Sequence, residues 1–167
     1  MRPGLLTLLL MLVVGLLAPA TAVAEPAAEP RPLWVAPLDG DLLVGRPFRA
    51  PPHRYGAGHR GADLRGSPGA RVLAAADGVV VFAGMVAGRP VVSIDHPNGL
   101  RTTYEPVDPS VGAGARVSRG SPVGILLAGH SGCPAPACLH WGLRRGEDYL
   151  DPLALLRPPP VRLLPWE

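Results

Sequence analysis

The chain has 167 residues, 16 of them basic and 13 acidic, and its formal net charge is +3 at pH 7. This length suffices for one hydrophobic core but hardly for two, and the small, scattered charge argues against nucleic acid as a partner. All basic residues are arginine, and the 22 prolines and 21 glycines are many for this length, a composition typical of a GC-rich genome.

The first 24 residues have the pattern of an export signal. Arg2 precedes an apolar run from Leu5 to Leu17, and Ala22-Val23-Ala24 forms a small-x-small cleavage site. We therefore expect a signal peptide over 1–24, a mature chain that starts near Glu25, and a protein outside the cytoplasm without a remaining membrane segment. The alternative is an uncleaved anchor, because the apolar run nearly reaches membrane-spanning length.

The rest of the chain is predicted to hold one all-β domain between two flanks. Residues 25–33, rich in Pro and Ala, have the composition of a spacer, and residues 157–167 that of a Pro-rich tail. Over residues 34–156, short valine-rich runs alternate with turn residues, and no segment keeps the helical period for three turns. We expect a compact antiparallel β-sandwich or partly open barrel, with helix only at 152–156.

The expected strands follow one another between turn signals. They cover residues 71–75, 79–83, 91–95, 100–105, 122–127 and 139–144. Asp77-Gly78 has the composition of a tight turn, so the first two strands are predicted to form a hairpin. Pro97-Asn98-Gly99 marks the turn between the third and fourth strands, and residues 107–120 are expected to be a loop.

Two short motifs carry the candidate chemistry. His59 and Asp63 are four residues apart, but Gly61 between them argues against a helix, so a strand end or a bent loop would bring them together. His140 lies on the last predicted strand, where Cys138 shares its face and the residue between them points to the core. Two imidazoles and a carboxylate suit zinc. Taken alone, His59 and Asp63 fit a surface pair equally well.

An ordered series of segments resembles the lysostaphin- or LytM-type zinc endopeptidases, a family that cuts peptide cross-links in bacterial cell walls. The resemblance runs from about Pro37 to Leu156. The segments that carry it are 58–64 (GHRGADL), 66–72, 74–80, 92–96, 98–100, 103–104, Gly112, Val117, Gly120, 122–124, 139–143 (LHWGL) and 151–153 (DPL). It implies zinc held by His59, Asp63 and His140 with an open fourth position, and peptidoglycan stem peptides as the substrate.

The resemblance also implies two further histidines near the reacting water, and this sequence has neither. Their positions are Pro106, two residues after Tyr104, and Cys138. Neither proline nor an oxidised cysteine exchanges a proton, and acid–base help is typically worth about 10²–10⁴-fold. Tyr104, expected on the face of Pro106, and His130, in the loop before the last strand, are the candidate replacements. Glu105 is expected on the opposite face, and a loop histidine bonded to backbone is the alternative for His130.

Cys133 and Cys138 are the only cysteines. Because an exported chain meets an oxidising compartment, we expect a disulfide that pins the short loop between them against the strand of His140. The alternative is a Cys138 thiolate as the fourth zinc ligand, which would close the site and make it structural.

Two functions follow from these residues. The first is a secreted, cell-wall-associated zinc metallopeptidase that hydrolyses peptidoglycan cross-links by a zinc-activated water with an altered catalytic set. The second is a catalytically impaired zinc-binding module with a wall-binding or regulatory role. The three retained ligands favour the enzyme, and the two missing histidines favour the module. A small exported β domain with an incidental histidine cluster is the third alternative.

Overall fold

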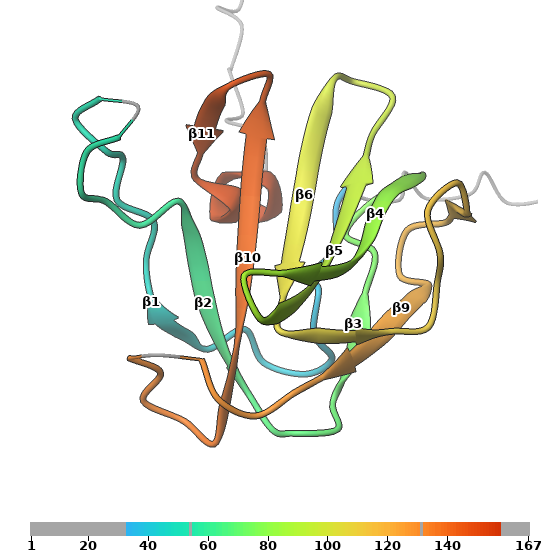
Figure 1. Ribbon diagram of the computed structural model, residues 1–167, viewed down its shortest axis with the longest axis horizontal. Coiled ribbons are helices and arrows are strands. Elements are labelled where there is room, and N and C mark those ends of the chain that lie inside the picture. The colour runs from blue at the N-terminus through green and yellow to red at the C-terminus, as the bar shows by residue number, and fades with distance from the viewer. Residues whose placement is uncertain (1–32, 54, 131, 158–167) are drawn as a thin grey trace, which may run out of the picture. The chain divides into compact units, whose positions relative to one another are not determined.

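The computed structural model describes residues 33–53, 55–130 and 132–157 (Figure 1). These residues belong to one compact unit. The expected signal peptide and nearly all of the expected spacer and tail lie outside the described residues. Within the described ranges, no helix is long and apolar enough to cross a membrane.

The described residues are almost entirely β-structure. The strands are β1 (Val44–Arg46), β2 (Gly61–Gly66), β3 (Arg71–Leu73), β4 (Gly78–Val86), β5 (Arg89–Asp95), β6 (Leu100–Glu105), β7 (Val107–Pro109), β8 (Arg116–Val117), β9 (Pro122–Leu126), β10 (Ala137–Arg145) and β11 (Asp148–Leu150). One short 3-10 helix, η1 (Pro152–Leu156), starts at Asp151, whose carboxylate accepts a hydrogen bond from the Leu153 amide. The predicted all-β domain with helix only at 152–156 is confirmed.

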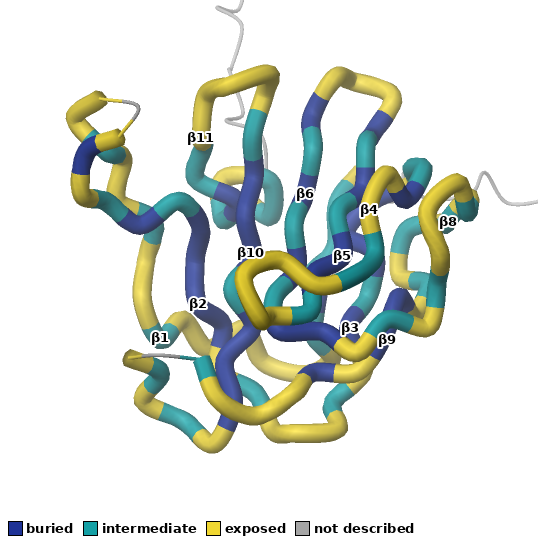
Figure 2. Tube along the Cα trace, viewed as in Figure 1, coloured by how far each residue is buried: buried dark blue, intermediate teal, exposed yellow. Residues whose placement is uncertain are grey.

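Two antiparallel sheets build the fold, and neither closes into a barrel. The larger sheet has the order β1-β2-β10-β6-β5-β4-β8, with β11 paired to β10, and the smaller sheet has the order β3-β9-β7. The strands β10, β6 and β5 stand at the centre of the larger sheet, and their residues form much of the buried part of the chain (Figure 2). This open antiparallel architecture agrees with the predicted fold class.

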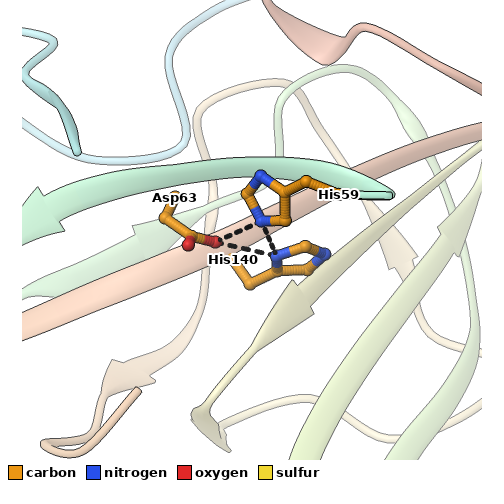
Figure 3. A group of neighbouring side chains, drawn as sticks. All are labelled: His59, Asp63 and His140. Atoms are coloured by element: carbon orange, nitrogen blue, oxygen red, sulfur yellow. Dashed lines mark hydrogen bonds and ion pairs between the residues drawn. The ribbon is translucent and has the colours of Figure 1, made fainter. Parts of the chain in front are cut away.

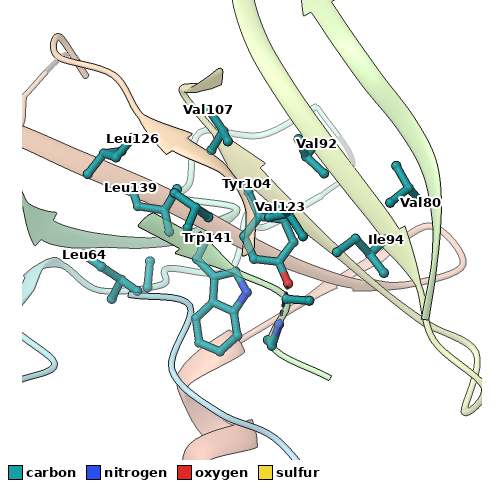
Figure 4. Packing of buried hydrophobic residues seen from close by; sticks show 14 of the residues in the cluster. Leu64, Val80, Val92, Ile94, Tyr104, Val107, Val123, Leu126, Leu139 and Trp141 are labelled. Atoms are coloured by element: carbon teal, nitrogen blue, oxygen red, sulfur yellow. Dashed lines mark hydrogen bonds between the residues drawn. The ribbon is translucent and has the colours of Figure 1, made fainter. Parts of the chain in front are cut away.

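Side chains of both sheets meet in one hydrophobic core (Figure 4). The larger sheet contributes Leu64, Val80, Val92, Ile94, Tyr104, Leu139 and Trp141, and the smaller sheet contributes Val72, Val107, Val123 and Leu126. On β10, Leu139 and Trp141 are fully buried, whereas His140 between them is half-buried on the opposite face. The two-residue period of β10 therefore sends one set of side chains to the core and leaves the other for the site.

The predicted hairpin between residues 71–75 and 79–83 is wrong. β3 pairs with β9 in the smaller sheet, and β4 pairs with β5 and β8 in the larger one. Gly78 does not serve a tight turn, since a Cβ at this position would collide with the Asp95 carbonyl oxygen and the Ile94 side chain. Gly78 instead begins β4, and the absence of a side chain lets β4 pack closely against β5. The buried residues 74–76 connect the two sheets.

Two further expectations need correction. The predicted loop over residues 107–120 contains the short strands β7 and β8. The hairpin lies instead between β4 and β5, where Ala87 (φ 49°) and Gly88 (φ 81°) both adopt left-handed backbone conformations. Two consecutive residues with positive φ fit a two-residue hairpin turn. Ala87 is a poor sequence signal for such a turn, so β4 is longer than the residue pattern predicts.

Candidate metal centre and adjoining groove

Asp63 is the centre of a cluster of imidazoles on the face of the larger sheet opposite the core. Its side chain is fully buried, and its Oδ1 lies 2.9 Å from His59 Nε2 and 2.8 Å from His140 Nδ1 (Figure 3). The two ring nitrogens are 3.2 Å apart. The structure thus brings together His59, Asp63 and His140 of the two sequence motifs, with one potential ligand atom from each within 4.8 Å of the others.

The local backbone explains why these residues converge. His140 pairs directly with Asp63 across the β2–β10 ladder, so their side chains project from the same face. His59 precedes β2 and forms an isolated bridge with Arg49, in which each backbone amide donates to the other residue's carbonyl. The chain bends between this bridge and the start of β2 at Gly61, as the glycine predicted.

Gly61 is required by the packing of the cluster. A Cβ at this position would lie 2.5 Å from the Trp141 carbonyl oxygen and 2.7 Å from His140 Nε2. The absence of a side chain therefore lets the His140 ring lie against the start of β2. Its position in the motif between His59 and Asp63 has a direct steric reason.

The donor set fits a divalent metal such as zinc. His59 Nδ1 lies 2.8 Å from the Pro47 carbonyl oxygen, which can only accept, so this nitrogen carries the proton and Nε2 of the neutral ring presents a lone pair to Asp63. Asp63 Oδ2 is buried without a hydrogen-bond partner among the described residues. The lone pairs of His59 Nε2 and of the Asp63 carboxylate face one another, and one carboxylate oxygen is buried without a partner among the described residues. A cation between these groups would make both arrangements favourable.

The electrostatics of the cluster keep Asp63 ionised. Burial raises the pKa of this carboxyl group, but the hydrogen bond to His140 and the electrostatic attraction of the neighbouring imidazoles of His130, His59 and His140 outweigh burial. Together they hold the pKa of Asp63 below its usual value. The carboxylate is the form in which an aspartate binds a metal.

His130 lies beside the cluster. Its Nε2 is 3.2 Å from Asp63 Oδ1, its side chain is only 12% exposed, and its ring centroid is 5.6 Å from that of His140. The loop that carries it is tied to β10 by the Cys133–Cys138 disulfide. The predicted disulfide is thus present in the structure, and the alternative of a Cys138 thiolate ligand is wrong because this sulfur is bonded to Cys133.

Tyr104 does not face the cluster, and its expected role beside the reacting groups is wrong. The residue is fully buried in the core, where its hydroxyl accepts hydrogen bonds from the Ala75 amide and the Thr102 hydroxyl. Burial raises the pKa of this hydroxyl. The expected face of Tyr104 rests on alternation from Pro106, but Pro106 is itself buried and follows the end of β6.

Glu105 lies on the face of β6 that contains the cluster, so the prediction that it occupies the opposite face is wrong. Residues 101, 103 and 105 of β6 are half-buried, while 100, 102 and 104 are buried. Glu105 pairs with His140 across the β6–β10 ladder, lines the same pocket as His59 and His130, and forms an ion pair with Arg89 at 3.0 Å. In the sequence, Leu100, Thr102 and Tyr104 alternate with Arg101, Thr103 and Glu105. This alternation is the signal that could have placed Glu105 correctly.

A groove of about 790 Å³ extends from His140 over the outer face of β10, β6 and β5. Its walls include Phe82 and Val86 of the β4–β5 hairpin, which are 39% and 47% exposed. Arg60 and Tyr149 also line it, with the guanidinium 5.4 Å from the ring centroid. The cluster therefore opens into a space that could hold an extended chain.

The comparisons with known proteins agree with this geometry. The sequence model of peptidase family M23 matches residues 57–152, which include the whole cluster. The chain belongs to peptidase family M23. Members of this family are metallopeptidase-type hydrolases that act on peptidoglycan, and the resemblance to lysostaphin- and LytM-type enzymes is confirmed.

Three similar proteins illustrate the relationship. Rv2891, an uncharacterised protein of Mycobacterium tuberculosis, is 49% identical over 160 residues, which are 93% of this chain and 62% of the relative. The DD-carboxypeptidase/endopeptidase Mpg of Neisseria meningitidis is 31% identical over 61% of this chain and 24% of its own. Helicobacter pylori Csd3 has 26% identity and a TM-score of 0.61 over 80% of this chain and 35% of its own. This M23 chain thus spans less than two thirds of the length of each of these three proteins.

Proposed function

We propose that this M23 protein is a secreted zinc metallopeptidase that hydrolyses peptide cross-links of cell-wall peptidoglycan. The observation that carries the proposal is the environment of Asp63, a buried carboxylate with imidazole nitrogens at 2.8 and 2.9 Å and one oxygen that has no hydrogen-bond partner among the described residues. His59 Nε2, His140 Nδ1 and the Asp63 carboxylate would hold the metal. The predicted signal peptide supports the site of action outside the cytoplasm.

Each residue near the cluster has a part in this chemistry. A bound zinc ion would act as a Lewis acid that polarises a carbonyl group and lowers the pKa of water. Glu105, beside His140, can accept the proton that water loses, and its ion pair with Arg89 orients the carboxylate. His130 can donate a proton to the leaving amine. These two residues would supply the acid–base help that Pro106 and Cys138 cannot provide.

The test is direct hydrolysis by the purified protein with its metal content measured by mass spectrometry. The protein is incubated with purified peptidoglycan, with and without a zinc chelator, and new amine ends are followed by chromatography. We expect about one zinc per chain and chelator-sensitive cleavage. His140→Ala should lose both, while His53→Ala, an exposed histidine outside the cluster, should keep both. Absence of zinc would remove the metal assignment of His59, Asp63 and His140.

A second function is favoured by one specific observation. Cys138, at one of the two family positions for an acid–base histidine, is locked in a disulfide, and the other position is Pro106. A zinc-containing module that binds the wall or regulates another hydrolase would need neither histidine. One zinc per chain with binding to peptidoglycan but no new amine ends would identify this module.

A further inference from the structure

The groove beside His140 has a floor that can accept a polypeptide backbone. Gly142, Thr103 and Ser93 lie in register across β10, β6 and β5 and line the groove. A Cβ added at Gly142 would meet only Thr103 and a backbone oxygen at ordinary contact distances of 3.5 Å and more. The small side chains therefore leave open space above the sheet in the groove. Packing within the sheet does not require a glycine at position 142.

The groove is also basic. Arg60, Arg89, Arg101 and Arg144 line it, against a single acidic lining residue, Glu105. Arg89 is paired with Glu105. Arg101 is paired with Asp95, which accepts hydrogen bonds from its Nε and, at 2.7 Å, from its Nη2. The carboxylates of Glu105 and Asp95 are thus each engaged by one arginine.

Of the two arginines outside these pairs, Arg60 donates a hydrogen bond to the Gly56 carbonyl oxygen and lies over the Tyr149 ring. Arg144 is the other. It stands directly opposite Arg101 across the β6–β10 ladder, and like charges in this position are destabilising. Within the described part of the chain, Arg144 makes no hydrogen bond or ion pair. It attracts Asp95 over a longer distance. This attraction helps to lower the pKa of Asp95, but less than the hydrogen bond and charge of Arg101 do. A half-buried guanidinium of this kind keeps its planar set of donors for an external carboxylate.

The distance between Arg144 and the cluster defines the ligand further. His140, Gly142 and Arg144 face the groove from alternate positions of β10. At about 3.3 Å per residue, the backbone of Arg144 lies about 13 Å along the strand from that of His140. An extended peptide lying parallel to β10 covers this distance with about four residues.

We propose that the groove binds an extended acidic peptide and that Arg144 holds a carboxylate of that peptide about four residues from the bond that lies beside His140. The proposal rests on the proposed peptidase function for the nature of the ligand. The exposed Phe82 and Val86 provide an apolar wall for its side chains, and the uncompensated charge at Arg144 sets its direction in the groove. Arg144 would therefore be a substrate-binding residue that favours peptides with a free acid.

The experiment compares two forms of one probe. A fluorescein-labelled peptidoglycan stem tetrapeptide with free carboxylates and the same peptide with amidated carboxylates are titrated with the zinc-loaded protein, and binding is followed by fluorescence anisotropy at 4 °C. Chromatography of the recovered probe verifies that it stays intact. Arg144→Gln is the test variant. Arg145→Gln is the matched control, because Arg145 is exposed and follows Arg144 with its side chain on the other face of β10.

We expect the wild-type protein and Arg145→Gln to bind the acid form about tenfold more tightly than the amidated form, as a charge-assisted pair predicts. Arg144→Gln should bind both forms with the affinity of the amidated form. Equal affinity for the two forms in the wild type, no binding of either form, or an undiminished preference in Arg144→Gln would overturn the proposal. If the wild type prefers the acid form, Arg144→Gln loses this preference and the protein does not hydrolyse peptidoglycan, the peptidase function is refuted and the carboxylate site at Arg144 is retained.

Discussion

Glu105 and His140 stand directly opposite each other across the β6–β10 ladder, and both side chains line the pocket that contains His59 and His130. Facing positions in an antiparallel pair bring Cβ atoms to about 5 Å. A carboxylate therefore lies next to one of the proposed zinc ligands, in a chain with Pro106 and Cys138 where the resemblance implies acid–base histidines. This relationship makes Glu105 the first residue to test for proton transfer.

Glu105→Gln removes the proton acceptor but keeps the size of the side chain. If Glu105 is the general base, peptidoglycan hydrolysis should fall by about 10²–10⁴-fold while zinc content stays unchanged. The rate of release of amine ends and the zinc content by mass spectrometry measure the two quantities. Asp108→Asn, an exposed carboxylate on β7, is the control and should keep full activity. Unchanged hydrolysis in Glu105→Gln would assign the base to another group.

Gly61→Ala should destabilise the fold and disturb the cluster. The added Cβ would press on the Trp141 carbonyl oxygen and the His140 ring, and overpacking of this kind costs about 1–3 kcal/mol. Urea unfolding and zinc titration report the two effects. Gly112→Ala is the control because a Cβ there meets nothing within 4 Å, so its stability should be equal to or slightly above that of the wild type. Equal losses in both variants would refute the steric explanation.

The Cys133–Cys138 disulfide closes a loop of five residues in sequence separation. Removing this constraint from the unfolded chain in the double variant Cys133→Ser/Cys138→Ser should lower the free energy of unfolding by about 2 kcal/mol. Chemical denaturation of the oxidised wild type and of the variant gives the difference. The reduced wild type is the matched control and should behave like the variant. A variant as stable as the oxidised protein would show that the native fold holds the loop without the bond.

Because of His96, we expect the free energy of unfolding to fall at acidic pH. Burial lowers its pKa in the folded protein below the ordinary 6.5, although the Asp77 carbonyl and the charges of Asp95 and Asp77 act in the opposite direction. Because the unfolded chain then binds a proton at higher pH than the folded one, the stabilisation is complete above about pH 6.5 and is lost as the pH falls through that value. Its ring nitrogens lie 2.8 Å from the Asp77 carbonyl and 2.8 Å from the Thr102 hydroxyl.

Free energies of unfolding at pH 7.5 and 5.5 test this expectation. The wild type should lose more stability between the two values than His96→Gln, which keeps polar groups but does not titrate. The histidines of the cluster contribute equally to both proteins, so they cancel in the comparison. An identical pH dependence in the two proteins would show that His96 takes up its proton equally in the folded and unfolded states.

Local patterns in the sequence were sufficient for part of this description. The short valine-rich runs predicted the all-β class, and 100–105 was predicted with the bounds of β6. The two motifs around His59 and His140 selected the residues that converge on Asp63 only together with the ordered resemblance to the zinc endopeptidases. Two-residue alternation along β10 also predicted that Cys138 and His140 share a face. Cys133 and Cys138 had one possible partner each.

Tertiary structure alone decided how these pieces meet. Strand pairing depends on contacts between distant residues, so the pairing of β3 with β9 rather than β4 could not be read from the Asp77-Gly78 signal. Which face of β6 is buried depends on what covers it, and this placed Tyr104 in the core and Glu105 beside His140. The register of β6 with β10 set Arg144 against Arg101. The sequence by itself determined which side chains are present and how they alternate, whereas the packing of the two sheets decided which of them share a site.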